Sequence, residues 1–219
     1  MSFGRCWLLV CIALLVPGDL AAQPAAAKTE LSQLMAAFSR MPGLEARFVE
    51  EKRLGMLARP LTSQGRLYFA RPGLLLRRVE QPRASEVIIT PDELKVKDAS
   101  GEQRIDLASR PDVRPFVESL TWLLAGDEKA LASVYKIELT PAQADGPWQL
   151  TLTPKADPLA HLLAHIRIIG KGLAVTEIQV REKGGDETIT RIVEANPARK
   201  FTASETSSLF GVKPKPSAK

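Results

Sequence analysis

The sequence predicts a mainly β fold with some helix: an incomplete antiparallel β-barrel of about ten or eleven strands, with helical lids over an apolar cavity. Short runs in which apolar and polar residues alternate recur through most of the chain, as in half-buried strands. Two apolar helical stretches lie outside these runs. No repeat of fixed period and no linker divides the runs, so we expect one domain, at residues 29–200.

Residues 1–22 have the pattern of a secretory signal peptide. Arg5 precedes an apolar run at residues 6–16, and small residues follow at its end. The run is shorter than the roughly 20 apolar residues that a membrane-spanning helix needs. We therefore expect cleavage, with residues 25–27 as an alternative cut position, then a linker at residues 23–28 and a mature protein in the periplasm.

Composition excludes several classes of function. Both cysteines, Cys6 and Cys11, lie inside the signal segment, so the mature chain has no thiol for a disulfide, a zinc site or a nucleophile. The net charge is +5, but aromatic residues make up only 5% of the chain, so nucleic acid is not an expected partner. Part of the positive charge lies in residues 201–219, a divergent segment with a basic, proline-rich tail. The charge either attracts anionic lipid surfaces or only keeps the protein soluble.

The first element expected in the domain is a helix over residues 28–41. Apolar residues recur there at three- and four-residue spacing, Thr29 can cap the start, and Pro42-Gly43 stops the run. Strand-like runs follow, separated by turn residues. The first group, expected to form an antiparallel meander, lies at residues 44–49, 66–69, 75–79, 87–89, 94–96 and 104–107. The second group lies at residues 135–139, 148–152, 166–168, 175–180 and 189–192.

Residues 110–132, between the two groups of strands, have the pattern of helix with an apolar face. Gly126-Asp127 marks a break followed by a new helix cap. Strands that alternate in this way bury one face only, and a single sheet of so many strands curls because its twist accumulates. The helices then cover the open side of the barrel. If the side chains fill the interior incompletely, an apolar pocket remains.

Motifs for catalysis are weak. Ser133 and Lys136 match a Ser-x-x-Lys pattern that requires a helix, but the alternation that follows predicts a strand with the two side chains on opposite faces. His161 and His165 are four residues apart, but no glutamate follows the first, so we expect surface histidines rather than metal ligands. We expect no enzyme activity, no catalytic residue, no metal site and no cofactor.

The inward positions of the strands are aliphatic. They indicate binding of an apolar ligand by burial and not by a chemical reaction. Burying one methylene group gains about 0.8 kcal/mol, so a sixteen-carbon acyl chain corresponds to about 12 kcal/mol of transfer free energy. An apolar cavity could therefore bind a lipid chain without any chemistry. The alternative is that these side chains fill their own core.

Residues 63–74, Ser-Gln-Gly-Arg-Leu-Tyr-Phe-Ala-Arg-Pro-Gly-Leu, resemble the most recognisable stretch of the LolA-like periplasmic outer-membrane lipoprotein carriers. In these carriers a Gly-x-Leu strand runs into Arg-Pro and then Gln-Pro, which here is Gln81-Pro82. The resemblance extends over residues 28–197. Stretches that resemble a divergent, carrier-related branch lie at residues 123–127, 148–154 and 166–170.

The resemblance implies an incomplete antiparallel barrel with helical lids over an apolar cavity. Members of the family accept acylated proteins released by an inner-membrane transporter and hand them to a receptor on the outer membrane. In them the arginine of the Arg-Pro step hydrogen-bonds to the lid, a role that falls to Arg71 by resemblance. The alternative is that Arg71 is an ordinary exposed turn residue. The chain departs from the better-known carriers at Arg77 and Arg78, where they place an aromatic residue.

The expected function is that of a monomeric periplasmic carrier, which shields the acyl chains of lipoproteins between an inner-membrane transporter and an outer-membrane receptor or membrane. The alternatives are a carrier of another amphiphile, such as a glycolipid or pigment, and an interaction domain that senses stray lipoproteins. A hydrolase is the least supported class.

Site residues follow from the inward positions of the predicted strands and helices. The cavity wall is expected at Leu44, Phe48, Leu67, Phe69, Leu75, Val87, Ile89, Val96, Leu150, Leu152, Ile166 and Ile168. The lid is expected at Arg71, Val113, Phe116, Val117, Leu120 and Leu123. A charge at Phe48 or Leu150 is expected to abolish cargo uptake.

Overall fold

The computed structural model describes residues 24–111, 114–142, 146–172 and 174–212. The predicted signal segment and the end of the basic tail lie outside these residues. The strands are β1 (Gly43–Arg53), β2 (Leu61–Ala70), β3 (Leu74–Gln81), β4 (Ser85–Ile89), β5 (Glu93–Asp98), β6 (Gly101–Asp106), β7 (Tyr135–Thr140), β8 (Trp148–Pro154), β9 (Leu163–Lys171), β10 (Ala174–Glu182) and β11 (Glu187–Asn196). The helices are α1 (Pro24–Ser39), α2 (Arg114–Ala125), α3 (Glu128–Val134), α4 (Leu159–Leu162) and α5 (Ala203–Phe210).

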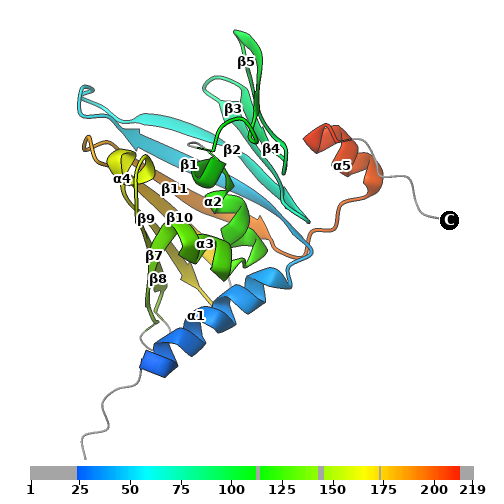
Figure 1. Ribbon diagram of the computed structural model, residues 1–219. Coiled ribbons are helices and arrows are strands. Elements are labelled where there is room, and N and C mark those ends of the chain that lie inside the picture. Colours follow the sequence, from blue (N-terminus) through cyan, green and yellow to red (C-terminus); the bar gives the residue numbers. More distant parts are fainter. Residues whose placement is uncertain (1–23, 112–113, 143–145, 173, 213–219) are drawn as a thin grey trace, which may run out of the picture.

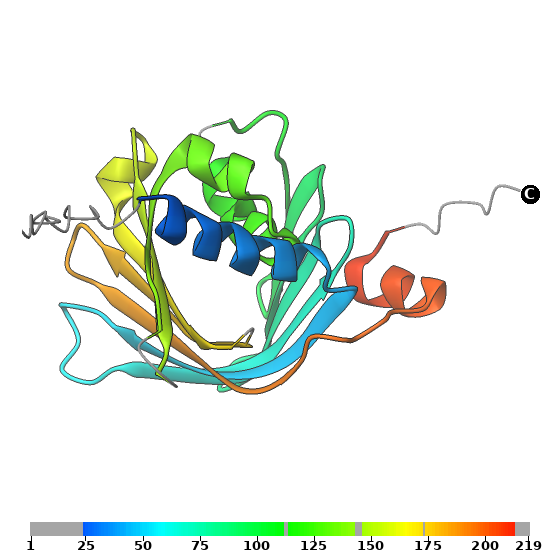
Figure 2. The same cartoon turned by 90° about the horizontal axis from the view of Figure 1, so that it is seen from below.

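One antiparallel sheet of eleven strands forms the body of the protein, in the order β6-β5-β4-β3-β2-β1-β11-β10-β9-β8-β7. The sheet curls into an open trough, and β6 and β7 are its unpaired edges (Figures 1 and 2). Irregularities in register, such as the one between Arg47 and Phe48, add to the curl. The predicted incomplete barrel, its strand number and its first meander are therefore confirmed.

Three helices cover the hollow side of the trough. Helices α2 and α3 join edge strand β6 to edge strand β7, and α1 crosses the open side (Figure 2). The predicted break lies between α2 and α3, where the Asp127 side chain accepts from Ala130 N at 2.9 Å. Gly126 has φ +71°, and a Cβ there would lie 2.2 Å from the carbonyl oxygen of Met35 in α1. This glycine therefore permits the close approach of the turn to α1.

Helix α1 begins earlier than expected. It starts at Pro24, so most of the segment predicted as a linker is helical and Thr29 lies inside the helix, not at its cap. Proline is favourable in the first turn of a helix, and the alanines that follow are strong helix formers. Helix α1 ends at Ser39, two residues before the expected end, and the chain enters β1 at Gly43, so the Pro42-Gly43 step lies after the helix as predicted.

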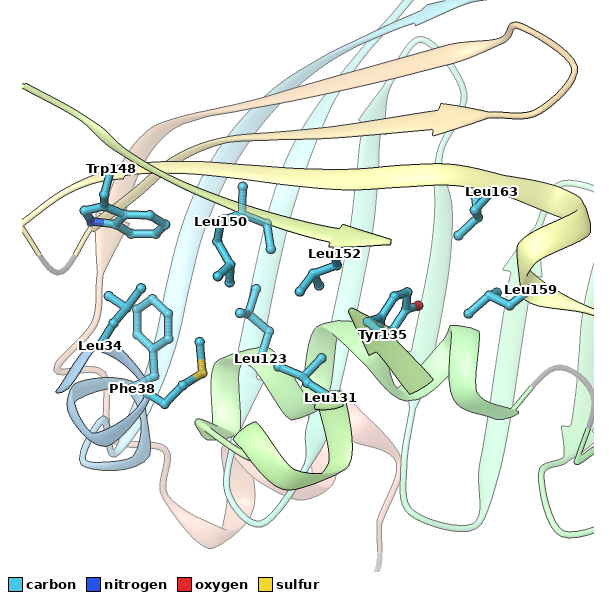
Figure 3. Packing of buried hydrophobic residues seen from close by; sticks show 12 residues of the cluster. Leu34, Phe38, Leu123, Leu131, Tyr135, Trp148, Leu150, Leu152, Leu159 and Leu163 are labelled. Carbon is cyan, nitrogen blue, oxygen red and sulfur yellow. The ribbon is translucent and has the colours of Figure 1, made fainter. Parts of the chain in front are cut away.

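The buried side chains inside the trough form two clusters. One joins α1, α2 and α3 to β7, β8 and β9 and includes Phe38, Leu123 and Leu150 (Figure 3). Its ring contact between Phe38 and Trp148 has a centroid distance of 6.4 Å. The other cluster lies on β1 to β4, with contributions from α2, and includes Phe69. The core is thus divided between the two halves of the sheet, with the hollow of the trough between them.

The C-terminal segment contains a structured element that the sequence analysis placed outside the domain. Helix α5 packs against the convex face of the sheet, where Phe210 is buried with Tyr68 and Leu76. Thr202 and Glu205 form a capping box at its start. Phe201 links the helix to the sheet, since its ring lies 6.4 Å from Tyr68 and 6.0 Å from Phe210.

We expect Phe210→Ala to lower the free energy of unfolding by about 3–5 kcal/mol, because it removes a fully buried aromatic ring. The control is Ser208→Ala on the exposed side of the same helix, with an expected change within about 0.5 kcal/mol. Urea denaturation followed by circular dichroism measures both. Equal stability of the two variants would contradict the assignment of α5 to the folded domain.

Candidate functional site

A cavity of about 510 Å³ lies between the concave face of the sheet and helix α2. Sixteen of the 21 residues that line it are apolar. Its volume lies in the range of about 300–1,000 Å³ that is typical of small-molecule sites. A smaller hollow of about 90 Å³ adjoins it near the end of α1, and the two share Leu67, Leu120, Leu123, Ile178 and Ile192. The interior of the trough is therefore not packed solid.

Most of the predicted wall residues line this cavity. These are Phe48, Leu67, Leu75, Val87, Ile89, Val96, Leu152, Ile166 and Ile168. Leu44 lines the smaller hollow. Phe69 and Leu150 line neither space, because both are fully buried in the two core clusters. Figure 3 shows Leu150 directed from β8 toward Leu123 of α2. A charge at Leu150 would therefore disrupt packing and would not test the cavity wall.

The predicted lid residues of α2 face the cavity where the structure describes them. Val117, Leu120 and Leu123 line it. Val113 and the side chain of Phe116 lie outside the described residues. Helix α2 thus covers one side of the cavity.

Sequence reasoning missed nine lining residues. The apolar ones are Leu94, Ile178, Val180 and Ile192, and the polar ones are Glu50, Arg77, Ser119, Thr188 and Thr190. The period of two contains the signal for most of them, because Glu50 follows Phe48, and Arg77 follows Leu75, at the next inward position. The polar residues were missed because charged side chains on a strand are ordinarily assigned to the solvent face.

Arg71 holds the end of α1 against the sheet. Its Nε donates to the carbonyl oxygen of Met41 at 2.6 Å, and its Nη2 donates to that of Phe38 at 2.8 Å. The last carbonyls of a helix have no partner within the helix, and the guanidinium fork donates to one of them, that of Phe38, and to the carbonyl of Met41 just after α1. Arg71 therefore contacts the helical cover at α1, although much of its side chain is exposed.

The sequence matches the family model described as "Outer membrane lipoprotein carrier protein LolA-like" over residues 21–210. The chain belongs to the LolA-like family. The match includes α5, which the resemblance noted in the sequence did not reach. A search of curated proteins by sequence returned no match.

Solved structures of similar fold are distant. A LolA superfamily protein from Nitrosomonas europaea has a TM-score of 0.47 at 11% identity, covering 81% of this chain and 96% of that one. A DUF1329 family protein from Desulfovibrio piger has a TM-score of 0.46 at 13% identity, covering 86% and 100%. The MucA/MucB complex of Pseudomonas aeruginosa has a TM-score of 0.46 at 14% identity, covering 80% and 58%. At these values the similarities carry no argument about what the LolA-like chain binds.

In the part of the chain that the structure describes, the Ser-x-x-Lys residues lie in different elements. Ser133 lies in the last turn of α3 and donates to the carbonyl oxygen of Ala130, whereas Lys136 lies in β7 and pairs with Glu138. Groups of three or more potential metal-ligating side chains are absent from this part of the chain. Within the described residues, none of the helices has the length and apolar character needed to span a bilayer.

Two titratable groups outside the cavity lining, Tyr135 and His165, favour their neutral forms. Burial raises the pKa of the Tyr135 phenol, and its hydrogen bond with Ser119, at 2.6 Å, opposes this rise. Burial, followed by the charges of Arg167 and Arg181, lowers the pKa of His165 from its ordinary value of 6.5. The imidazole of His165 is therefore uncharged near pH 7.

We expect Arg71→Ala to accelerate amide hydrogen exchange in the last turns of α1 roughly tenfold, because each lost hydrogen bond contributes about 1 kcal/mol. Arg71→Lys should give an intermediate rate, since one ammonium group cannot replace the fork. Arg59→Ala, in the exposed turn after β1, is the control for removal of a surface arginine. Exchange in α1 at the same rate in Arg71→Ala and the unchanged protein would contradict a role of Arg71 in holding the helix.

Proposed function

We propose that this LolA-like protein is a periplasmic carrier that binds the acyl chains of lipoproteins in its cavity and shuttles them from the inner to the outer membrane. The observation that carries the proposal is the cavity of about 510 Å³, with a lining that is mostly aliphatic. Membership of the LolA-like family supports a carrier rather than an enzyme. In this proposal the protein acts as a monomer. Its signal segment directs export and is then cleaved.

The energy for cargo binding comes from burial of hydrocarbon. Each methylene group that leaves water contributes about 0.8 kcal/mol, so even part of an acyl chain inside the cavity outweighs the loss of a few hydrogen bonds. The lining supports this mode of binding because side chains from both halves of the sheet, such as Val87 and Ile166, face the same space. No covalent step is needed for uptake or release.

Exchange of cargo requires the helices to move away from the sheet. The contacts that oppose this motion are the apolar packing of α1 and the two hydrogen bonds of Arg71. In the proposal an inner-membrane transporter supplies the cargo, and an outer-membrane receptor, or the membrane itself, receives it. The balance between the closed cover and the bound chain then sets how readily the cargo is handed on.

We expect Val180→Asp to reduce binding of acyl chains by about tenfold or more, because it places a carboxylate in the apolar cavity. Val193→Asp is the matched control: Val193 lies on the neighbouring strand β11 but is 61% exposed. Mass spectrometry of lipids extracted from the secreted proteins, together with circular dichroism, measures binding and folding separately.

The identity of the extracted compound distinguishes the candidate functions. Triacylated protein supports the proposed lipoprotein carrier, and a free glycolipid or pigment indicates the amphiphile carrier instead. Equal binding by folded Val180→Asp and Val193→Asp would contradict the use of this cavity.

A further inference from the structure

One end of the cavity carries polar side chains in an otherwise aliphatic lining. We call Glu50, Arg77, Thr188 and Thr190 the Arg77 cluster. Glu50 and Thr190 are paired positions on β1 and β11, and Arg77 comes from β3. They lie toward the turn that joins β1 to β2, at the opposite end of the cavity from α1. Nothing in the packing of the aliphatic core requires charges at this position.

The contacts within the cluster hold Arg77 in one place. Its Nη2 donates to Oε1 of Glu50 at 2.7 Å, and the hydroxyl of Thr190 donates to Oε2 of Glu50 at 2.9 Å. The guanidinium carbon lies 4.6 Å from the centre of the Phe48 ring. Only 28% of the Arg77 side chain and 17% of the Glu50 side chain are exposed.

A glycine lies on the strand between the two members of the ion pair. Gly65 on β2 is paired with Phe48 on β1 and with Val79 on β3, so it lies between the two strands that contribute the ion pair. A Cβ there would lie only 2.0 Å from the carbonyl oxygen of Arg78. The glycine therefore permits the close approach of β2 to β3 at the residues next to Arg77.

Stability alone does not account for an ion pair in this setting. Replacing a buried pair by apolar residues of similar size is often neutral or stabilising, because desolvation offsets the attraction. Arginine carries five N–H donors, and among the described residues Arg77 makes one hydrogen bond, to Glu50. Thr188 adds a further hydroxyl group to the same end of the cavity. The cluster therefore offers hydrogen-bond donors to whatever occupies the cavity.

The charges of the cluster favour a neutral acceptor. Arg77 and Glu50 balance each other, and the Glu50 carboxylate repels an anionic group placed beside Arg77. At the next inward position of β1, Lys52 is balanced in turn by Glu182 at 4.0 Å. A carbonyl oxygen that joins an acyl chain to its head group has no charge and accepts from both an arginine and a hydroxyl.

We propose that the Arg77 cluster binds the ester or amide carbonyl of an acyl compound whose chain occupies the apolar part of the cavity. This inference rests on the proposed function, because it assumes that the cavity holds an acyl chain. It adds a preference: acyl esters and amides bind more tightly than free fatty acids and plain hydrocarbons of the same length.

The test is displacement of the neutral apolar dye N-phenylnaphthylamine from the full secreted protein by glycerol monolaurate, laurate or dodecane. We expect the unchanged protein to bind glycerol monolaurate most tightly. In the double variant Glu50→Gln/Arg77→Met, affinity for glycerol monolaurate should fall about tenfold, the effect of one hydrogen bond to a charged donor. Affinity for dodecane should stay within about twofold of the original, because the apolar lining is intact.

The control is Glu86→Gln/Arg78→Met. Arg78 is the neighbour of Arg77 on β3, and its Nε donates to Glu86 at the same distance, 2.7 Å, but the pair is absent from the cavity lining. This variant should leave all three affinities unchanged.

Equal affinity of the unchanged protein for the three ligands would overturn the inference while leaving an acyl-chain carrier intact. Tighter binding of laurate than of glycerol monolaurate would overturn it in favour of a carboxylate site. Equal loss in the Arg78 control would also overturn it. Failure of all three ligands to displace the dye would remove the proposed function together with the inference.

Discussion

The cavity depends on a sheet that curls but does not close. Edge strands β6 and β7 are unpaired with each other, so the concave face of eleven strands must be covered by other elements. Protein interiors ordinarily pack to the density of organic crystals, with few voids larger than a water molecule. Here helices α1 to α3 pack closely against β7 to β9, and α2 also reaches the cluster on β1 to β4. Between these two contacts the strands face one another across about 510 Å³.

The cover is held by two kinds of contact near the C-terminal end of α1. Apolar side chains such as Phe38 and Trp148 pack together, and Gly126 lets α1 approach the turn before α3. Close to these contacts, Arg71 donates hydrogen bonds to the carbonyl oxygen of Phe38 in the last turn of α1 and to that of Met41, just after the helix. Hydrogen bonds of this kind contribute about 1 kcal/mol each, so they can be broken and remade without loss of the fold. A cover held in this way is stable when closed, but it can open without unfolding of the sheet.

Much of the fold follows from one periodicity, and the exceptions have physical causes. Alternation at period two predicts the strands and places nine of the twelve expected wall residues on the cavity. It cannot tell a position that faces the hollow from one that a helix covers, which is why Phe69 and Leu150 belong to the packed clusters. That distinction depends on where α1 and α2 rest, which is a tertiary property.

Other features were not predicted from the sequence, because the type of residue indicated a different environment from the one it has in the structure. Pro24 and the alanines after it indicated a linker, although proline suits the first turn of a helix. The C-terminal segment is rich in small polar residues, and Phe201 and Phe210, with Leu209 and Val212, anchor it to the convex face. Arg77 occupies an inward position by period but carries a charge, and the structure shows it inside the trough beside Glu50.

The position of the Arg77 cluster makes one end of the cavity polar and leaves the other end apolar. Along β1 the inward residues change from Leu44 and Ala46, near the end of α1, to Phe48 and then to Glu50. An amphiphile has the same gradient, so a bound acyl compound would lie with its chain under α1 and α2 and its head toward the turn between β1 and β2. The ring of Phe48 lies at the boundary, where one face meets the guanidinium of Arg77. Because the ion pair is rigid and balanced, it can orient a neutral linkage without requiring the cargo to carry charge, and this suits a carrier whose affinity comes chiefly from burial of hydrocarbon.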